Sequence, residues 1–136
     1  MSAIFTKWFP AGFRLINGLT LTNWFNKPQT STEDTVTAFA GGGQASATQI
    51  TAAKTRVSVC ATNADSVKLP PSSQSVGMEY LIINDGAANL AIFPEGTATI
   101  DGGAASASVT LTAGRRASFW CVASGAWESG YMLKSA

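Results

Sequence analysis

The sequence has 136 residues and no histidine. This absence excludes the Ser-His-Asp and Cys-His systems that activate a nucleophile. It also excludes most zinc, copper and non-haem iron sites, in which imidazole is a frequent ligand. A pair of carboxylates is the hydrolytic machinery that the chain could still supply.

Charge is also scarce. Charged residues make up 12% of the chain and the net charge is +1, whereas about 25% charged residues is ordinary. The chain therefore lacks the electrostatic footprint of a nucleic-acid-binding or anionic-membrane-binding protein. The pair Arg115-Arg116 follows a turn glycine and is interpreted as a solvated strand end rather than a phosphate site. A surface of small neutral residues is poorly protected against association, which favours an assembly.

The chain has two cysteines, too few for a disulfide framework. Cys60 and Cys121 each lie in a strand-like apolar run, so buried free thiols are expected, with a bridge between them as the alternative. No apolar run approaches the ~20 residues of a membrane helix. The N-terminus lacks a basic start and an uninterrupted apolar core, so we expect no signal peptide and synthesis in a cytoplasm.

Residues 1–30 differ from the rest, because six of the thirteen aromatic residues lie there. We predict an N-terminal arm and connector over 1–34 and a β-domain over 35–136. The arm would bury its rings against a neighbouring subunit, since aromatic anchors dominate interface energetics. The alternative is that these rings cover the core of the domain itself. The predicted anchors are Phe5, Trp8, Phe9, Phe13, Trp24 and Phe25.

After residue 34, short alternating or apolar runs are separated by turn signals roughly every 8–12 residues, a spacing typical of an all-β sandwich or barrel. The run MEYLIINDG is the most continuous and predicts a central strand. Asp85-Gly86 and Asp101-Gly102 offer the positive φ angles of tight turns. No segment after residue 30 has convincing helical periodicity. The fold class predicted is all-β: a β-sandwich, jelly-roll-like, with an extended arm.

Candidate chemistry is sparse. Most carboxylates lie in or beside turns, and the exceptions are Glu79 and Glu128, near strand starts. Trp120, Trp127 and Tyr131 are candidates for an exposed platform that binds a glycan. In the run SFWCV, either Phe119 or Trp120 must face away from the core, because only one face of a sheet in a sandwich is covered.

The stretch from Ala64 to Trp127 resembles a β-rich module of tailed-bacteriophage structural proteins. The resemblance covers roughly residues 45–127, including the approach ITAAKTRVSVCAT. Each element is weak alone, and their order and spacing are more specific. The elements are Asp65-Ser66-Val67-Lys68-Leu69-Pro70, Ile83-Asn84-Asp85-Gly86-Ala87, Phe93-Pro94, Ile100-Asp101-Gly102, Ala113-Gly114 and Ser124-Gly125-Ala126-Trp127.

This resemblance implies a virion structural role without catalytic residues, usually as a homo-oligomer. The chain is short, with no coiled-coil heptads and no repetitive shaft, which suits a capsid decoration (cement) protein. The expectation is a homodimer or homotrimer on the capsid surface, bound to the major capsid protein, with no cofactor, metal, nucleic acid or membrane. A fibre or tail component, or a receptor-binding (glycan-binding) module, is the first alternative. A small hydrolase with two carboxylates is the second.

Overall fold

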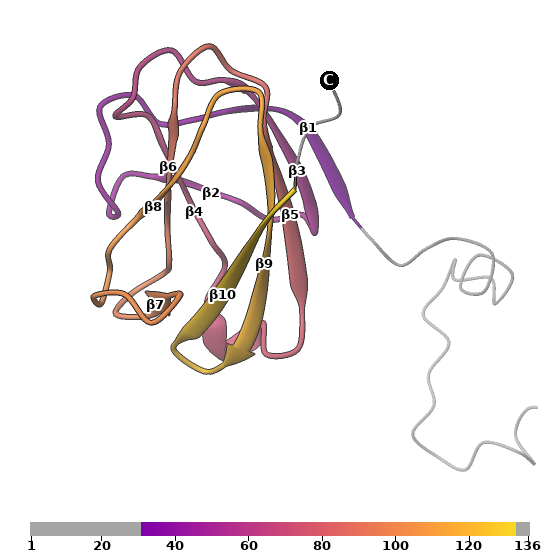
Figure 1. Cartoon of the computed structure of the whole chain (residues 1–136), viewed down its shortest axis with the longest axis vertical. Helices are drawn as coiled ribbons and strands as arrows, with labels where there is room; N and C mark the ends of the chain where they lie inside the picture. The colour runs from indigo at the N-terminus through magenta and orange to yellow at the C-terminus, as the bar shows by residue number, and fades with distance from the viewer. Residues whose placement is uncertain (1–30, 133–136) are drawn as a thin grey trace, which may run out of the picture.

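The computed structural model describes residues 31–132, and they form an all-β domain (Figure 1). The all-β prediction is therefore confirmed. Within this range the one helical segment is a short 3₁₀ turn, η1 (Ser72–Gln74). The strands are β1 (Thr32–Thr37), β2 (Thr48–Gln49), β3 (Lys54–Val59), β4 (Ser66–Lys68), β5 (Glu79–Asn84), β6 (Leu90–Phe93), β7 (Thr99–Ile100), β8 (Val109–Leu111), β9 (Arg116–Ala123) and β10 (Ala126–Met132).

The strands form two sheets. Sheet A has the order β1-β3-β5-β9-β10-β7, and sheet B has the order β2-β4-β6-β8. Most of sheet A and all of sheet B lie on opposite sides of the domain in Figure 1. The central position predicted for the MEYLIINDG run is confirmed, because β5 lies between β3 and β9.

The order of the strands differs from that of a jelly roll. From β1 to β6 the chain alternates between the sheets, and β1, β3 and β5 pair in parallel, as do β2, β4 and β6. Two successive strands, one in each sheet, thus make one turn of a β-solenoid-like coil. Jelly rolls are built from antiparallel strands, so the jelly-roll prediction is not what the structure shows. Parallel neighbours need a crossover, and here a strand in the opposite sheet supplies it.

The last four strands close the coil. β8 pairs antiparallel with β6, and β9 pairs antiparallel with β5. β10 returns antiparallel along β9, and β7 lies parallel to β10 at the sheet edge. These strands cover the final turn, so that its backbone groups are paired rather than left as an open edge.

The core lies between the two sheets. Sheet A contributes Val57, Ile82, Phe119 and Trp127, all with no exposed surface. Sheet B contributes fully buried aliphatic side chains from its four strands and the residues beside them. Because successive side chains of a strand point to opposite faces, the intervening residues of sheet A form an outer face. The sheet B members of the core are Ile50, Val67, Leu69, Leu90, Ile92 and Leu111.

Buried polar side chains hold the loops between turns of the coil. The Asn84 side chain, fully buried, donates to the carbonyls of Ala88 and Leu111 at 2.9 Å and accepts from the Gly86 amide at 3.1 Å. Asp65 is buried and accepts hydrogen bonds from the Thr62 hydroxyl and from the backbone amides of residues 61 and 62. These bonds, first that from the Thr62 side chain, hold the pKa of Asp65 below its ordinary value.

The turn glycines confirm one expectation and correct another. Asp101 and Gly102 have positive φ angles of 53° and 66°, as predicted for a tight turn. Gly86 does not have a positive φ. It is required instead by proximity, because a Cβ at this position would lie 2.5 Å from the Cβ of Cys60.

Cys60 and Cys121 are buried free thiols, as expected, and no bridge joins them. Burial raises the pKa of both, and the negative charge of Asp65 adds to the effect at Cys60. Between residues 31 and 132, no helix has the length and apolar character needed to cross a bilayer. β1 begins at Thr32, inside the segment predicted as a connector.

Candidate binding face

The outer face of sheet A carries the clearest grouping of chemistry in residues 31–132. The strand register brings its outward side chains into three rows that cross the strands. Charged and apolar residues are mixed in these rows. The rows are Glu79–Trp120–Glu128, Lys54–Leu81–Ser118–Gly130 and Arg56–Ile83–Arg116–Met132.

Trp120 is the main apolar group of the first row, which we call the Glu–Trp–Glu row (Glu79, Trp120, Glu128). Phe119 is fully buried and Trp120 is 40% exposed, so Trp120 is the ring of this pair that faces outward. The indole extends over Gly130, where a Cβ would lie only 2.8 Å from two ring carbons. Gly130 therefore gives the ring room to lie against the sheet.

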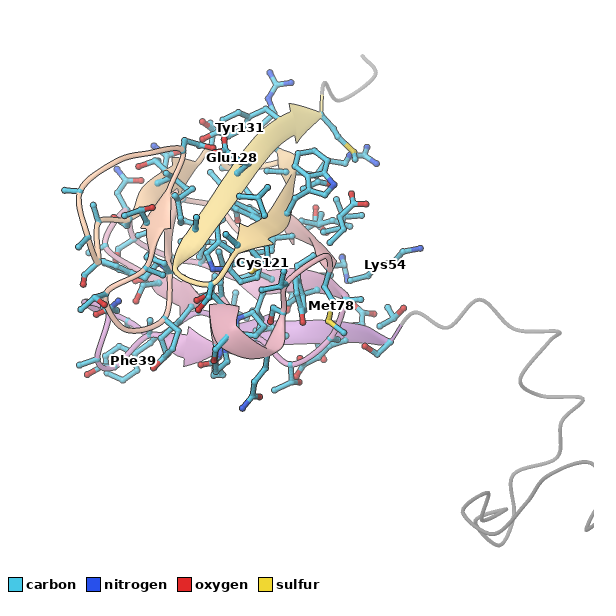
Figure 2. The ribbon with its side chains drawn as sticks, turned by 90° about the horizontal axis from the view of Figure 1, so that it is seen from below. Phe39, Lys54, Met78, Cys121, Glu128 and Tyr131 are labelled. Atoms are coloured by element: carbon cyan, nitrogen blue, oxygen red, sulfur yellow. The ribbon has the colours of Figure 1, made fainter. Side chains whose placement is uncertain are left out.

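The two carboxylates flank Trp120 on either side. Glu79 begins β5 and Glu128 lies on β10, and both are directly opposite Trp120 of β9. Their backbones are two strand spacings apart, about 10 Å. Glu128 is exposed on β10, where Figure 2 labels it. The pair meets across an exposed ring rather than across a cleft.

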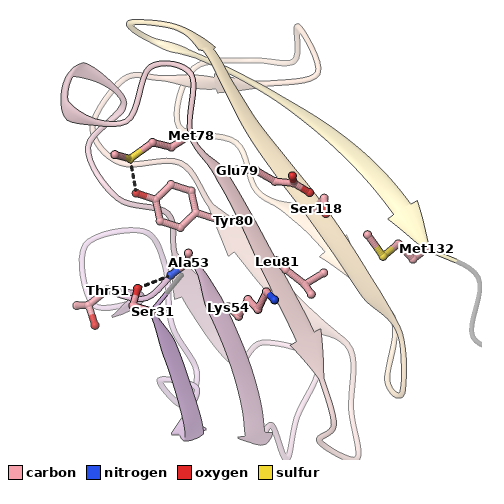
Figure 3. Close-up of a pocket in the computed structure, with 10 residues that line it drawn as sticks. All are labelled: Ser31, Thr51, Ala53, Lys54, Met78, Glu79, Tyr80, Leu81, Ser118 and Met132. Atoms are coloured by element: carbon pink, nitrogen blue, oxygen red, sulfur yellow. Dashed lines mark hydrogen bonds between the residues drawn. The ribbon is translucent and has the colours of Figure 1, made fainter. Parts of the chain in front are cut away.

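A groove of about 640 Å³ adjoins this row (Figure 3). We call it the outer groove; it runs from Ser31, beside β1, to Met132 at the end of β10. Its volume is in the range of small-ligand pockets. Leu81 and the two methionines give it an apolar surface, and Lys54 and Glu79 add opposite charges. Its principal lining residues are Ser31, Lys54, Met78, Glu79, Leu81, Ser118 and Met132.

Ser118 is an unusual part of this groove. Its residue has no exposed surface, and its Oγ has no hydrogen-bond partner among the described residues. Buried hydroxyls are normally paired, because leaving one unpaired costs roughly 1–3 kcal/mol.

The platform predicted from Trp120, Trp127 and Tyr131 does not exist as one surface. Trp127 is fully buried, and its ring meets that of Tyr80 edge to face with centroids 5.7 Å apart. Tyr131 is exposed but shares the strand face of Trp127, and its hydroxyl donates to the Thr110 carbonyl of β8. Trp120 is on the opposite face. The prediction for Trp127 is therefore wrong, and Trp120 and Tyr131 remain separate exposed rings.

The turn carboxylates have local partners. Arg56 bonds to Asp34 and to Asp85, which ties β1, β3 and the end of β5 together. The Arg56 hydrogen bond holds the pKa of Asp34 below its ordinary value. Asp101 accepts from the Ser129 amide and hydroxyl. Within residues 31–132 no group of three or more acidic or sulfur-bearing side chains could hold a metal ion.

The six predicted arm anchors, from Phe5 to Phe25, lie outside the described residues. The sequence also gave no sign that Lys54, Ser118 and Met132 would line one groove, because they come from different strands. No family model, no curated protein and no solved structure matches this chain.

Proposed function

We propose that the chain is a non-enzymatic structural protein of a tailed-phage virion, which decorates the capsid and stabilises it by bridging subunits of the major capsid protein. The observation that carries this proposal is the outer face of sheet A. It is a wide sheet face on which an exposed tryptophan, aliphatic residues, a methionine and arginines lie together, and aromatic residues, Met and Arg are enriched in protein interfaces. The resemblance of residues 45–127 to phage structural modules supports the same role.

The coil also suits a load-bearing part. In each sheet the strands are hydrogen-bonded to their neighbours, and one core extends from the first turn to the closing strands. Such a domain resists local opening, because few backbone groups depend on water alone. Copies arranged with the symmetry of a shell would add avidity to a modest individual contact.

Reconstitution tests this proposal. Heads purified from a phage that lacks this chain are mixed with the purified full chain, pelleted and heated. We expect saturable binding in a fixed ratio to the major capsid protein and a higher temperature of DNA release. The double variant Trp8→Ala/Phe9→Ala, altered only in the arm, should bind more weakly. No binding by the unaltered chain would contradict the proposal.

A second candidate is a receptor-binding part of a fibre or tail, and Trp120 favours it. An exposed indole between two carboxylates offers a saccharide a stacking surface and hydrogen-bond acceptors for its hydroxyls. A glycan array with the unaltered chain and with Trp120→Ala tests this candidate. Specific binding that Trp120→Ala removes and Tyr131→Ala leaves intact would favour it over decoration.

A further inference from the structure

Strand β1 is irregularly paired with the rest of sheet A. It lies at the edge of the sheet and, among the described residues, pairs only with β3 (Figure 1). The register between the two strands shifts on either side of Val36, whereas β3 and β5 keep an unbroken register. Each such bulge disrupts the hydrogen-bond ladder locally. The contact between β1 and β3 is therefore less regular than the next contact in the sheet.

The hydrophobic core depends little on β1. Val36 is the one buried residue of this strand, and four of the other five residues are exposed. All other members of the core lie at Ala38 or later in the chain. If β1 separated from β3, the core would lose one valine side chain and would otherwise remain packed.

Thr35 adds backbone strain to β1. Its φ angle is 67°, in a region that a β-branched residue rarely adopts. Thr35 lies in the bulge between the paired residues Glu33 and Val36, and its side chain is exposed. Burial of this side chain therefore does not compensate for the strain. Separation of β1 from β3 would release the strain, which lowers the free energy needed to open the pair.

The polar contacts of β1 can break without leaving a charge buried. Arg56 lies 2.9 Å from Asp34, and the two side chains are 44% and 63% exposed, so this ion pair contributes little to stability. Arg56 also binds Asp85, and its guanidinium keeps that carboxylate when β1 leaves. The hydrogen bond from Thr51 to Glu33 is exposed as well.

The chain that follows β1 is firmly anchored. The Ala38 amide donates to the Val59 carbonyl at 2.9 Å, and Phe39 and Ser66 exchange two backbone hydrogen bonds of 2.9 and 3.0 Å. Ala38 is also buried. β1 can thus separate from β3 up to Thr37 while the rest of the first turn of the coil stays in place.

We propose that β1 is a releasable strand, which separates from β3 and returns while the rest of the domain stays folded. Separation frees six residues and adds up to about 20 Å to the reach of the chain that precedes the domain. The three rows of the outer face come from β3, β5, β9 and β10, so they keep their arrangement. This property does not depend on a virion role, and its failure and the failure of the decoration proposal are separate results.

Amide hydrogen exchange of the full chain, followed by NMR, tests the proposal. Two sets of amides are compared: those hydrogen-bonded between β1 and β3, and those hydrogen-bonded between β5 and β9. After correction for intrinsic rates, we expect the β1–β3 amides to exchange at least about a hundredfold faster. Their rates should hardly change in low urea, because a local opening exposes little surface, whereas the rates of the β5–β9 amides should rise.

Two pairs of variants assign the opening to β1, and far-UV circular dichroism checks that each variant is folded. Val36→Ala should speed exchange of the β1–β3 amides about tenfold and leave the β5–β9 amides unchanged. Val57→Ala, which alters the core on β3, should speed exchange of the β5–β9 amides as well. Thr35→Asn should slow exchange of the β1–β3 amides about three- to tenfold, because asparagine tolerates a positive φ. Thr32→Asn changes the same strand at a residue without a positive φ and should not slow it.

Three results would overturn the proposal. Equal rates and equal urea dependence of the two sets would show that β1 opens only when the whole domain unfolds. Equal acceleration of both sets by Val36→Ala would show the same. Equal effects of Thr35→Asn and Thr32→Asn would show that strain at Thr35 does not promote the opening.

Discussion

Replacing Trp127 by alanine tests whether this ring belongs to the core or to a binding surface. Trp127 is fully buried between the sheets and packs edge to face against Tyr80. Removing a buried tryptophan side chain costs about 3–5 kcal/mol, and the lost aromatic pair adds about 0.5–1.5 kcal/mol. We expect Trp127→Ala to lower the free energy of unfolding by about 4–5 kcal/mol, a large part of the 5–15 kcal/mol typical of a domain.

Trp127→Phe refines the expectation. Phenylalanine keeps an aromatic ring and removes the indole N–H, whose nitrogen is buried without a partner among the described residues. Relief of that unpaired donor offsets part of the lost packing. The expected cost is about 1–2 kcal/mol, well below that of alanine.

Urea unfolding followed by far-UV circular dichroism measures these changes without depending on tryptophan emission. With a slope of 1–3 kcal/mol per molar urea, Trp127→Ala should lower the midpoint by about 2 M. Trp120→Ala is the matched control and should change stability by less than about 1 kcal/mol, because Trp120 is on the outer face. Equal effects of the two alanine variants would refute the assignment of Trp127 to the core.

Three further variants test the loops. Asn84→Ala should cost about 3 kcal/mol in urea unfolding, because it removes the three hydrogen bonds of a fully buried side chain. Gly86→Ala should cost at least about 1–3 kcal/mol, since its Cβ would overlap Cys60, whereas Gly43→Ala has open space and should change stability by under 0.5 kcal/mol. The pKa of the Asp65 carboxyl is lower in the folded state than in the unfolded chain. The stabilisation from its ionised form is therefore complete above about pH 4 and is lost as the pH falls through the folded pKa. The urea midpoints at pH 7 and pH 3 should differ less in Asp65→Asn than in the unaltered chain.

The position of the strands could be predicted from the sequence because the signals are local. Alternating apolar residues and turn residues such as Asp101-Gly102 mark where a strand forms and where it ends. The partners of a strand leave no comparable signal. A parallel coil and an antiparallel jelly roll both need short strands of similar spacing, so β1 pairing with β3 could not be distinguished from an antiparallel arrangement.

The candidate site was predictable only in part, for the same reason. Phe119 and Trp120 are adjacent and both aromatic, so the sequence cannot say which faces the core. The proximity of Glu79 and Glu128 to Trp120 depends on the register of β5, β9 and β10. Trp127 was misplaced because a tryptophan after a turn can be a surface ring or a core ring, and only packing against Tyr80 distinguishes them.

The copy number of this chain in particles purified from its source tests the central proposal most directly. Quantitative mass spectrometry against the major capsid protein gives the ratio. The decoration role predicts a ratio near one, or a simple large fraction of one, as a shell-covering protein requires. A handful of copies per particle would point to a fibre or tail part, and absence from the particle would contradict the virion role.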